Sequence, residues 1–387
     1  MRFHGALAAE SDLETGCRTV AASIRAGLGD GPIDLVVVFA TPQHTAQLDR
    51  IPVLLHEQLG CRNLIGCTGQ TLIGDGRVVG AEPAIAVLAA RLPGVRLDTA
   101  ALGNGDLPNP DAPPAAWHEL LPPTTVPRRG MIVLSEPFHC DTRALLAGLD
   151  YAWPGLPKLG GIASGSRHPE GHVLFAGRGS HRQGAVVLSL AGEARVDAVV
   201  AQGCRPIGRP GRITKADRNR LVAVDDMSAR QYVERQLATL GVGELDLARH
   251  GPLCLGIASD PFAGQDAAAG DFLVRNIFGI DPNTGSLLVG DQLAAGRQVQ
   301  LHLRDRASSE RDLQLRLLSA NPGSALGALL FRCLGREGHD HRRFVAAAPE
   351  VPLVGFHCNG EIGPVGATTH LHGYTASFAL FRPLVAP

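Results

Sequence analysis

The 387-residue sequence is poor in tyrosine and tryptophan and has no blocks of like charge. It contains three tyrosines and two tryptophans, and its net charge is −1. A balanced charge without basic runs argues against binding nucleic acid or a membrane surface through bulk electrostatics. No apolar stretch reaches the roughly 18–20 residues that cross a bilayer, and the N-terminus lacks an apolar signal region. These absences predict a cytoplasmic protein.

The cysteine and glycine patterns lack several familiar motifs. The eight cysteines include no C-x-x-C pair and no metal-finger spacing, so we expect free thiols, most of them buried as small apolar residues. The glycine-rich segments at residues 66–76 and 160–165 have neither the G-x-G-x-x-G nor the P-loop spacing, which argues against a nucleotide-phosphate site. The cysteines are Cys17, Cys61, Cys67, Cys140, Cys204, Cys254, Cys333 and Cys358.

What the chain has in abundance is glycine (47) and proline (27), together with 45% apolar residues. This composition is typical of a globular protein with many short elements joined by turns. The length suggests two domains, and we place them at residues 1–215 and 216–387, with the boundary in the Gly-, Pro- and Arg-rich segment 205–222. Residues 103–129 are rich in proline and glycine and predict a surface loop.

One order of elements recurs three times: a buried strand, a helix, a glycine-containing strand, a hairpin and a closing strand. The expected first strands are residues 33–40, 131–135 and 328–333. The helices are residues 45–59, 141–149 and 339–348, and the glycine strands are residues 63–69, 158–165 and 353–358. The closing strands are residues 84–90, 185–190 and 376–381. Recurring units indicate one architecture used repeatedly, and the fold class is therefore α/β, mixed α+β, with helices covering mixed sheets.

Further elements lie between the second and third units. Ser228 is an N-cap for a helix at residues 228–240, and a second helix is expected at 307–318. A hairpin is expected around residues 281–285, and residues 298–304 alternate polar and apolar side chains as a half-buried strand does.

The densest cluster of reactive side chains occupies residues 355–373, in the third unit. The pair Asn359–Gly360 predicts a type I′ turn between two strands. A carboxylate beside apolar residues, such as Glu361, needs a partner. It either has a structural partner, which is a backbone group that it caps or an arginine such as Arg332, or it binds the ammonium of an amino-acid-like ligand. In the second case Arg304 or Arg275 binds the carboxylate of that ligand.

Three histidines and one thiol in this cluster leave further alternatives open. If residues 370–372 are extended, His370 and His372 point to one face, and with His357 they form a candidate metal or haem site. Cys358 and His372 form a candidate nucleophile and base. No third orienting residue is evident for such a pair.

Several motifs resemble the FIST domain family. The segments V-V-V-F-A-T-P from Val36 and I-G-C-T-G from Ile65 are similar to the FIST N-terminal domain. The segments R-N-I-F-G-I-D from Arg275, H-L-R-D from His302, L-L-F-R-C from Leu329 and G-F-H-C-N-G-E-I-G from Gly355 resemble the FIST C-terminal domain. The resemblance extends from about residue 30 to about residue 382.

This resemblance implies a sensory module that binds a small ligand, for which amino acids are proposed, and some members are described as haem-binding nitric-oxide sensors. We find no added output segment in the sequence and expect signalling through a separate partner protein. The predicted function is therefore non-enzymatic sensing of an amino-acid-like metabolite without a cofactor. The predicted ligand-binding residues are Cys358, Asn359, Glu361, His372, Arg332, Arg304 and Arg275. The alternatives are a haem-based sensor using His372 or His370, a Cys358-dependent enzyme and a protein-interaction scaffold.

Overall fold

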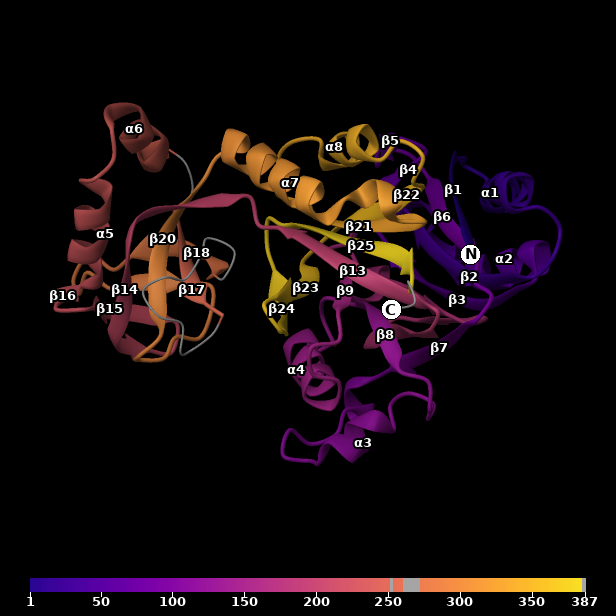
Figure 1. The fold of residues 1–387 in the computed structure, drawn as a ribbon, viewed down its shortest axis with the longest axis horizontal. Helices are drawn as coiled ribbons and strands as arrows, with labels where there is room; N and C mark the ends of the chain where they lie inside the picture. The colour runs from indigo at the N-terminus through magenta and orange to yellow at the C-terminus, as the bar shows by residue number, and fades with distance from the viewer. Residues whose placement is uncertain (251–252, 260–271, 385–387) are drawn as a thin grey trace. The chain divides into compact units, whose positions relative to one another are not determined.

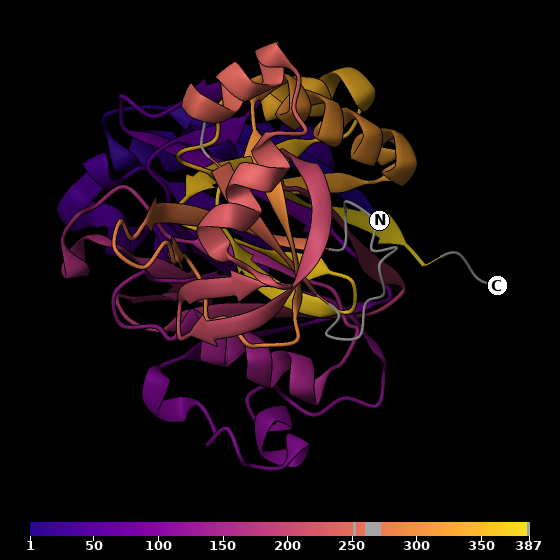
Figure 2. The same ribbon diagram turned by 90° about the vertical axis from the view of Figure 1, so that its left-hand side faces the viewer.

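The computed structural model describes residues 1–250, 253–259 and 272–384. The chain divides into two compact units, the first made of residues 1–200 and 315–387 and the second of residues 201–314 (Figure 1). Figure 2 shows the same elements turned by 90°. The mixed α/β class expected from the sequence is confirmed, since helices and mixed sheets are both present. The last seventy residues belong to the same unit as the first two hundred.

Three six-stranded sheets make up the first unit, and they share one strand order. The first sheet runs β1 (Arg2–Ala9), β6 (Ala84–Arg91), β2 (Ile33–Ala40), β3 (Cys61–Thr68), β10 (Leu174–Ala176) and β11 (Gly179–His181). The second runs β7 (Val95–Leu102), β12 (Ala185–Gly192), β8 (Arg128–Ser135), β9 (Lys158–Ile162), β23 (Glu361–Val365) and β24 (Thr368–His372). The third runs β13 (Ala194–Ala201), β25 (Ala376–Pro383), β21 (Gly327–Cys333), β22 (Leu353–Cys358), β4 (Leu72–Gly74) and β5 (Arg77–Val79).

The three predicted repeats correspond to these three sheets, and they exchange their hairpins. The first strands of the three repeats are β2, β8 and β21. Each is parallel to the glycine strand of its repeat (β3, β9 or β22) and antiparallel to the closing strand (β6, β12 or β25). The hairpin β4–β5 of the first repeat pairs with β22 of the third, β10–β11 of the second pairs with β3 of the first, and β23–β24 of the third pairs with β9 of the second. Each sheet is therefore completed by a neighbouring repeat.

One glycine recurs at the same place in each glycine strand. A Cβ atom on Gly66, Gly160 or Gly355 would lie 2.0, 1.7 or 2.0 Å from the carbonyl oxygen of the residue opposite it in the parallel strand. Such distances exclude any side chain. The requirement for a bare backbone explains why the sequence repeats a glycine here.

Helices cover the outer faces of the sheets, and the inner faces share one core. The crossover helices are α2 (Ile51–Leu59), α4 (Thr142–Ala152) and α8 (Asp340–Ala347), and the remaining helices of this unit are α1 (Leu13–Leu28) and α3 (Pro114–His118). Val37, Leu134 and Phe331 of the three first strands meet in the central core. Because both faces of these strands are covered, they read as continuous apolar runs. None of the helices among the described residues has the length and apolar character needed to cross a membrane.

The second unit is built on a seven-stranded sheet that closes on itself. Its order is β14 (Cys204–Asp217), β20 (Gln298–Arg304), β17 (Leu253–Ala258), β18 (Phe272–Ile280), β19 (Leu287–Val289), β15 (Arg220–Val224) and β16 (Met227–Ser228). The long strand β14 pairs with β20 through its first part and with β15 through its last, which closes the ring. The helices are α5 (Ala229–Leu237), capped by Ser228 as expected, and α6 (Val242–His250). Helix α7 (Arg306–Ala320) spans the change from one unit to the other.

This unit is inserted within the third repeat, between β13 and β21. In the first repeat the corresponding connection, between β1 and β2, contains α1. In the second repeat the connection between β7 and β8 contains α3. The continuous strand β14 runs through the segment in which the sequence suggested a domain boundary, whereas the compact units change at residues 200/201 and 314/315.

Candidate functional site

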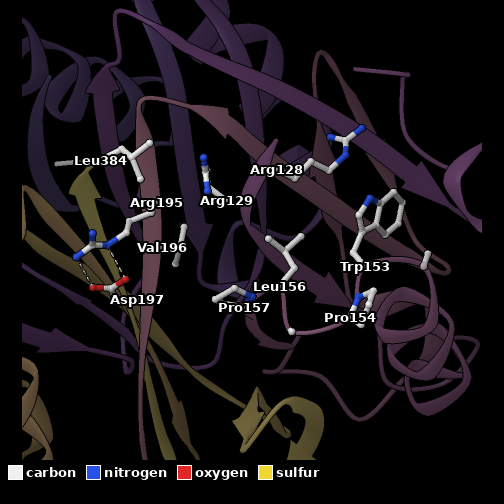
Figure 3. Close-up of a pocket in the computed structure, with 12 residues that line it drawn as sticks. Arg128, Arg129, Trp153, Pro154, Leu156, Pro157, Arg195, Val196, Asp197 and Leu384 are labelled. Atoms are coloured by element: carbon white, nitrogen blue, oxygen red, sulfur yellow. Dashed lines mark hydrogen bonds and ion pairs between the residues drawn. The ribbon is translucent and has the colours of Figure 1, made fainter. Parts of the chain in front are cut away.

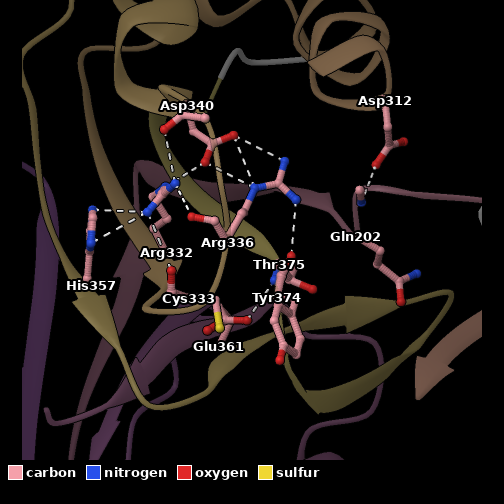
Figure 4. Close-up of polar contacts among 12 residues, drawn as sticks. Gln202, Asp312, Arg332, Cys333, Arg336, Asp340, His357, Glu361, Tyr374 and Thr375 are labelled. Atoms are coloured by element: carbon pink, nitrogen blue, oxygen red, sulfur yellow. Dashed lines mark hydrogen bonds and ion pairs between the residues drawn. The ribbon is translucent and has the colours of Figure 1, made fainter. Parts of the chain in front are cut away.

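Three of the residues singled out in the sequence, Arg332, His357 and Glu361, lie at or just beyond the carboxyl ends of β21 and β22, in the first unit (Figure 4). Cys333 and Cys358 stand directly opposite each other at the ends of these parallel strands. Glu361 begins β23, three residues after Cys358, and Thr375 precedes β25. Because the third repeat sends its hairpin into another sheet, the chain turns sharply here and brings these side chains together.

The carboxyl group of Glu361 is fully enclosed, with no solvent exposure. Its Oε2 atom accepts a hydrogen bond from the backbone N–H of Thr375 at 2.9 Å, and its Oε1 atom lies 3.3 Å from the Cys358 thiol. The Cys333 thiol also hydrogen-bonds to this carboxyl group. Burial disfavours the charged form and raises the pKa of Glu361 to about 8, although these hydrogen bonds lower it. The site therefore contains an acid that is protonated at neutral pH.

Beside this acid lies a buried network of two arginines and one aspartate. The Nε atom of Arg332 is 2.7 Å from Asp340 Oδ2, and that of Arg336 is 3.0 Å from the same oxygen. Burial alone would raise the pKa of Asp340, but the two guanidinium groups outweigh it and hold the pKa below its ordinary value. Two cations share one carboxylate, so the network carries one excess positive charge.

The excess charge affects the histidines that border the network. Both ring nitrogens of His357 lie 3.4–3.5 Å from Arg332 Nη1. Burial, and then this guanidinium, lower the pKa of His357 to about 3. Burial and neighbouring cations likewise lower the pKa of His341 to about 4. Both rings are consequently neutral at physiological pH, and they add no charge to the site.

A strained turn connects the acid with the arginine network. Tyr374 has φ 62°, a left-handed conformation that is unusual for a bulky side chain. Its carbonyl oxygen accepts a hydrogen bond from Arg336 Nη1 at 3.1 Å, and the next residue, Thr375, donates to Glu361. Its ring packs on Gly335, where a Cβ atom would lie 2.8 Å from the ring. Strained residues of this kind cluster at functional sites.

Of the predicted site residues, Cys358, Glu361 and Arg332 are brought together, but with other partners than expected. Arg332 pairs with Asp340, so the alternative in which it pairs with Glu361 is wrong. Glu361 instead accepts from the backbone N–H of Thr375, in agreement with the alternative that it caps a backbone group. Burial, with the nearby carboxyl group of Glu361, raises the pKa of the Cys358 thiol well above its ordinary value. A thiol held in its protonated form is a poor nucleophile.

Asn359 is exposed and supports the neighbouring repeat. Its Nδ2 atom donates a hydrogen bond to the carbonyl oxygen of Ala163 at 2.8 Å, beyond the end of β9. The predicted type I′ turn is wrong, because neither Asn359 nor Gly360 has a positive φ and because β22 and β23 belong to different sheets. The turn between β23 and β24 instead contains Gly366, with φ 62°.

The two histidines of β24 lie on one face of the strand, as expected for residues two apart. The rings of His370 and His372 are 6.2 Å apart, edge to face. His372 is buried, and its Nε2 atom is 3.0 Å from the carbonyl oxygen of Gly363. Within the part of the chain that the structure describes, no group of three or more His, Cys, Asp or Glu residues is arranged to hold a metal ion.

The remaining two predicted residues, Arg275 and Arg304, belong to the other compact unit. Arg275 Nε is 2.5 Å from Asp291 Oδ2, and Arg304 Nη1 is 3.4 Å from Asn276 Oδ1. Each arginine therefore has a polar partner within its own unit.

Sequence reasoning missed Cys333, Arg336, Asp340 and Tyr374. One signal was available for Asp340, because Arg332 interrupts an otherwise apolar strand and a buried guanidinium requires a counter-ion. Both Asp340 and Glu361 are close to Arg332 in the sequence. Only the placement of α8 decides between them.

Comparison with known proteins gives the family. Residues 34–227 match the FIST N domain, and residues 229–364 match the FIST C domain. The uncharacterized protein Rv0628c of Mycobacterium tuberculosis is 32% identical over 98% of this chain and 100% of its own length. The uncharacterized protein Mb0898c of Mycobacterium bovis is 31% identical over 91% of both chains. The predicted resemblance is confirmed over nearly the whole chain, which belongs to the FIST family.

Proposed function

We propose that this protein is a sensor that binds an amino-acid-like metabolite and passes the signal to a separate partner protein. FIST domains form a sensory, small-ligand-binding family that is described as non-enzymatic. The ligand class and the partner are our proposal. The observation that carries it is the enclosed carboxyl group of Glu361 beside an arginine network with one excess positive charge.

Such a site offers complementary partners to both ends of an amino acid. A ligand ammonium group stabilises the charged form of Glu361, which burial alone disfavours. Arg332 and Arg336 both pair with Asp340, and a ligand carboxylate could bind these guanidinium groups in bidentate fashion. Binding would stabilise the ionised form of Glu361 and would neutralise positive charge on the two arginines.

Ligand entry requires a movement, because Glu361 has no exposed surface. The turn formed by Gly373, Tyr374 and Thr375 is the element that we propose moves. It holds Glu361 through the Thr375 N–H and Arg336 through the Tyr374 carbonyl oxygen, and it is strained at Tyr374. Release of this turn would couple ligand binding to a change at the protein surface, where Gly373 is exposed.

The alternatives have less support. A Cys358-dependent enzyme needs a thiolate, whereas burial raises the pKa of this thiol. A haem site at His372 would have to replace the contact between its Nε2 atom and the Gly363 carbonyl oxygen. We therefore favour ligand sensing without a cofactor.

A thermal-shift screen against the common amino acids tests the proposal. A ligand that binds only the folded protein at 100 times its dissociation constant stabilises it by about 2.7 kcal/mol. We expect at least one amino acid to raise the melting temperature of the wild-type protein and to lose this effect in Glu361→Gln. The control is Glu57→Gln, an exposed position on α2. If no amino acid raises the melting temperature, or if a hit is undiminished in Glu361→Gln, the proposed site is wrong.

A further inference from the structure

A second region of the first unit has a cavity of about 530 Å³ (Figure 3). Its walls come from the start of β8, from the loop that follows α4 and from the start of β13. None of the predicted site residues lines it. Pockets of roughly 300–1,000 Å³ are the usual size for small-molecule sites.

The cavity is lined by three arginines, of which two have carboxylate partners. Arg128 Nη1 is 3.0 Å from Asp98 Oδ2, and Arg195 Nε is 3.0 Å from Asp197 Oδ1. In contrast, the side chain of Arg129 has no hydrogen bond or ion pair among the described residues, and its Nε atom is buried without a partner. A buried guanidinium nitrogen without an acceptor is costly.

The carboxylates near the cavity are already shared. Arg96 is a second partner of Asp98 at 3.0 Å, and Arg382 is a second partner of Asp197 at 2.9 Å. Four arginines, Arg96, Arg128, Arg195 and Arg382, thus share the two carboxylates of Asp98 and Asp197. No acid in this group is left to neutralise Arg129.

The rest of the wall is apolar and includes one large aromatic ring. Trp153, Pro154, Leu156, Pro157 and Val196 line the cavity. The guanidinium group of Arg128 lies over the Trp153 ring, 5.5 Å from its centroid. The same arginine donates to the carbonyl oxygen of Pro122 at 2.6 Å, so its position is fixed. The cavity thus combines one unpartnered cation with an apolar surface held in place by its neighbours.

We propose that this cavity binds a small organic anion, with a carboxylate or phosphate group on Arg129 and an apolar body against Trp153 and Leu156. The guanidinium group can bind such oxygens in bidentate fashion, which gives both affinity and orientation. The apolar wall selects an organic anion over an inorganic one. The Glu361 site needs an ammonium group in its ligand, and this site does not.

Intrinsic fluorescence provides a direct test, because the chain has two tryptophans and one of them, Trp153, lines the cavity. The probes are benzoate, phenyl phosphate and inorganic phosphate, each titrated into the full-length protein, with isothermal calorimetry as a second readout. We expect saturable binding of benzoate or phenyl phosphate, and the tighter of the two identifies the acid group. Inorganic phosphate should bind at least tenfold more weakly.

Variants at Arg129 decide the role of the cation. Arg129→Gln should weaken binding by a factor of roughly ten or more, whereas Arg62→Gln, at an exposed arginine paired with Asp34, should leave it unchanged. Arg129→Lys keeps the positive charge but loses the two parallel N–H donors of the guanidinium group, so we expect an intermediate loss of affinity. This variant also tests the proposal if Arg129→Gln fails to fold. Absence of saturable binding by both organic anions would overturn the proposal. Binding that is equal in the wild type and the Arg129 variants, or equal for inorganic phosphate and phenyl phosphate, would also overturn it.

Discussion

The buried carboxyl group of Glu361 makes a specific prediction about how the stability of the first unit depends on pH. Its pKa is raised from an ordinary 4.5 to about 8, so the folded state binds a proton that the unfolded state has released. Stability falls with rising pH wherever the folded state binds more protons, by about 1.4 kcal/mol per pH unit for one proton. The contribution of Glu361 is therefore complete below pH 4.5 and is lost as the pH rises through 8.

Buried histidines act in the opposite sense, so the effect of Glu361 is measured as a difference between the wild type and a Glu361 variant. Within the first unit, burial lowers the pKa of His357 to about 3 and that of His341 to about 4. These rings destabilise the fold at acidic pH, where the unfolded state takes up protons. At pH 6.5 each ring still destabilises the fold by about 0.4 kcal/mol, and this effect fades as the pH approaches 8. Between pH 6.5 and 8 the loss attributable to Glu361 is about 1.6 kcal/mol.

Chemical denaturation followed by tryptophan fluorescence measures this quantity, since Trp117 and Trp153 both belong to the first unit. The free energy of unfolding is measured for the wild type and for Glu361→Gln at pH 6.5 and at pH 8. Over this range we expect the wild type to lose about 1.6 kcal/mol of stability relative to Glu361→Gln, which resembles the protonated acid at every pH. The exposed control Glu57→Gln should follow the wild type. Parallel pH profiles for the wild type and Glu361→Gln would show that Glu361 is ionised in the fold and would refute the reasoning.

Three further predictions concern packing, charge and thiol reactivity. Gly355→Ala should destabilise the first unit by about 3 kcal/mol or more in urea denaturation, because the new Cβ atom would lie 2.0 Å from the Leu330 carbonyl oxygen. The control Gly105→Ala, which has open space around it, should change stability by less than about 0.5 kcal/mol. Asp340→Ala leaves two buried guanidinium groups without this carboxylate and should lower the free energy of unfolding by about 3–5 kcal/mol in the same assay. The control is the exposed Asp30→Ala. Equal losses of stability in the two variants would contradict the proposed network. In the native protein a thiol reagent should modify the partly exposed Cys140 and Cys204 before the buried Cys358. Cys358→Ser should therefore leave the labelling rate of the native protein unchanged. A slower labelling rate in this variant would indicate that Cys358 is a reactive thiol.

The local elements of this fold follow closely from the sequence. The strand at residues 33–40 has the predicted bounds, and Asp141 caps α4 by accepting from the Ala144 N–H, as a helix N-cap should. The threefold recurrence of elements was visible because each repeat uses the same short-range signals. Apolar runs, caps and glycines act over a few residues, and the sequence records them directly.

The arrangement of those elements depends on contacts between distant segments. Nothing in the sequence of β23 indicates that it pairs with β9, two hundred residues earlier, and this pairing is why Asn359–Gly360 is not a hairpin turn. The choice of Asp340 over Glu361 as the partner of Arg332 likewise depends on where α8 packs. The second unit is inserted between two parts of the third repeat. Arg275 and Arg304 are close to that repeat in sequence, but they belong to the inserted unit.

The exchange of hairpins has a consequence for how the first unit can be divided. Because β4–β5, β10–β11 and β23–β24 each complete the sheet of another repeat, the three repeats form a closed cycle of mutual donors and acceptors. A single repeat excised from the chain would keep its own hairpin without a sheet to join and would leave the edge of its glycine strand open. Three copies of such a fragment could in principle satisfy one another by the same exchange of hairpins. The single chain can be regarded as such a trimer with its subunits covalently joined.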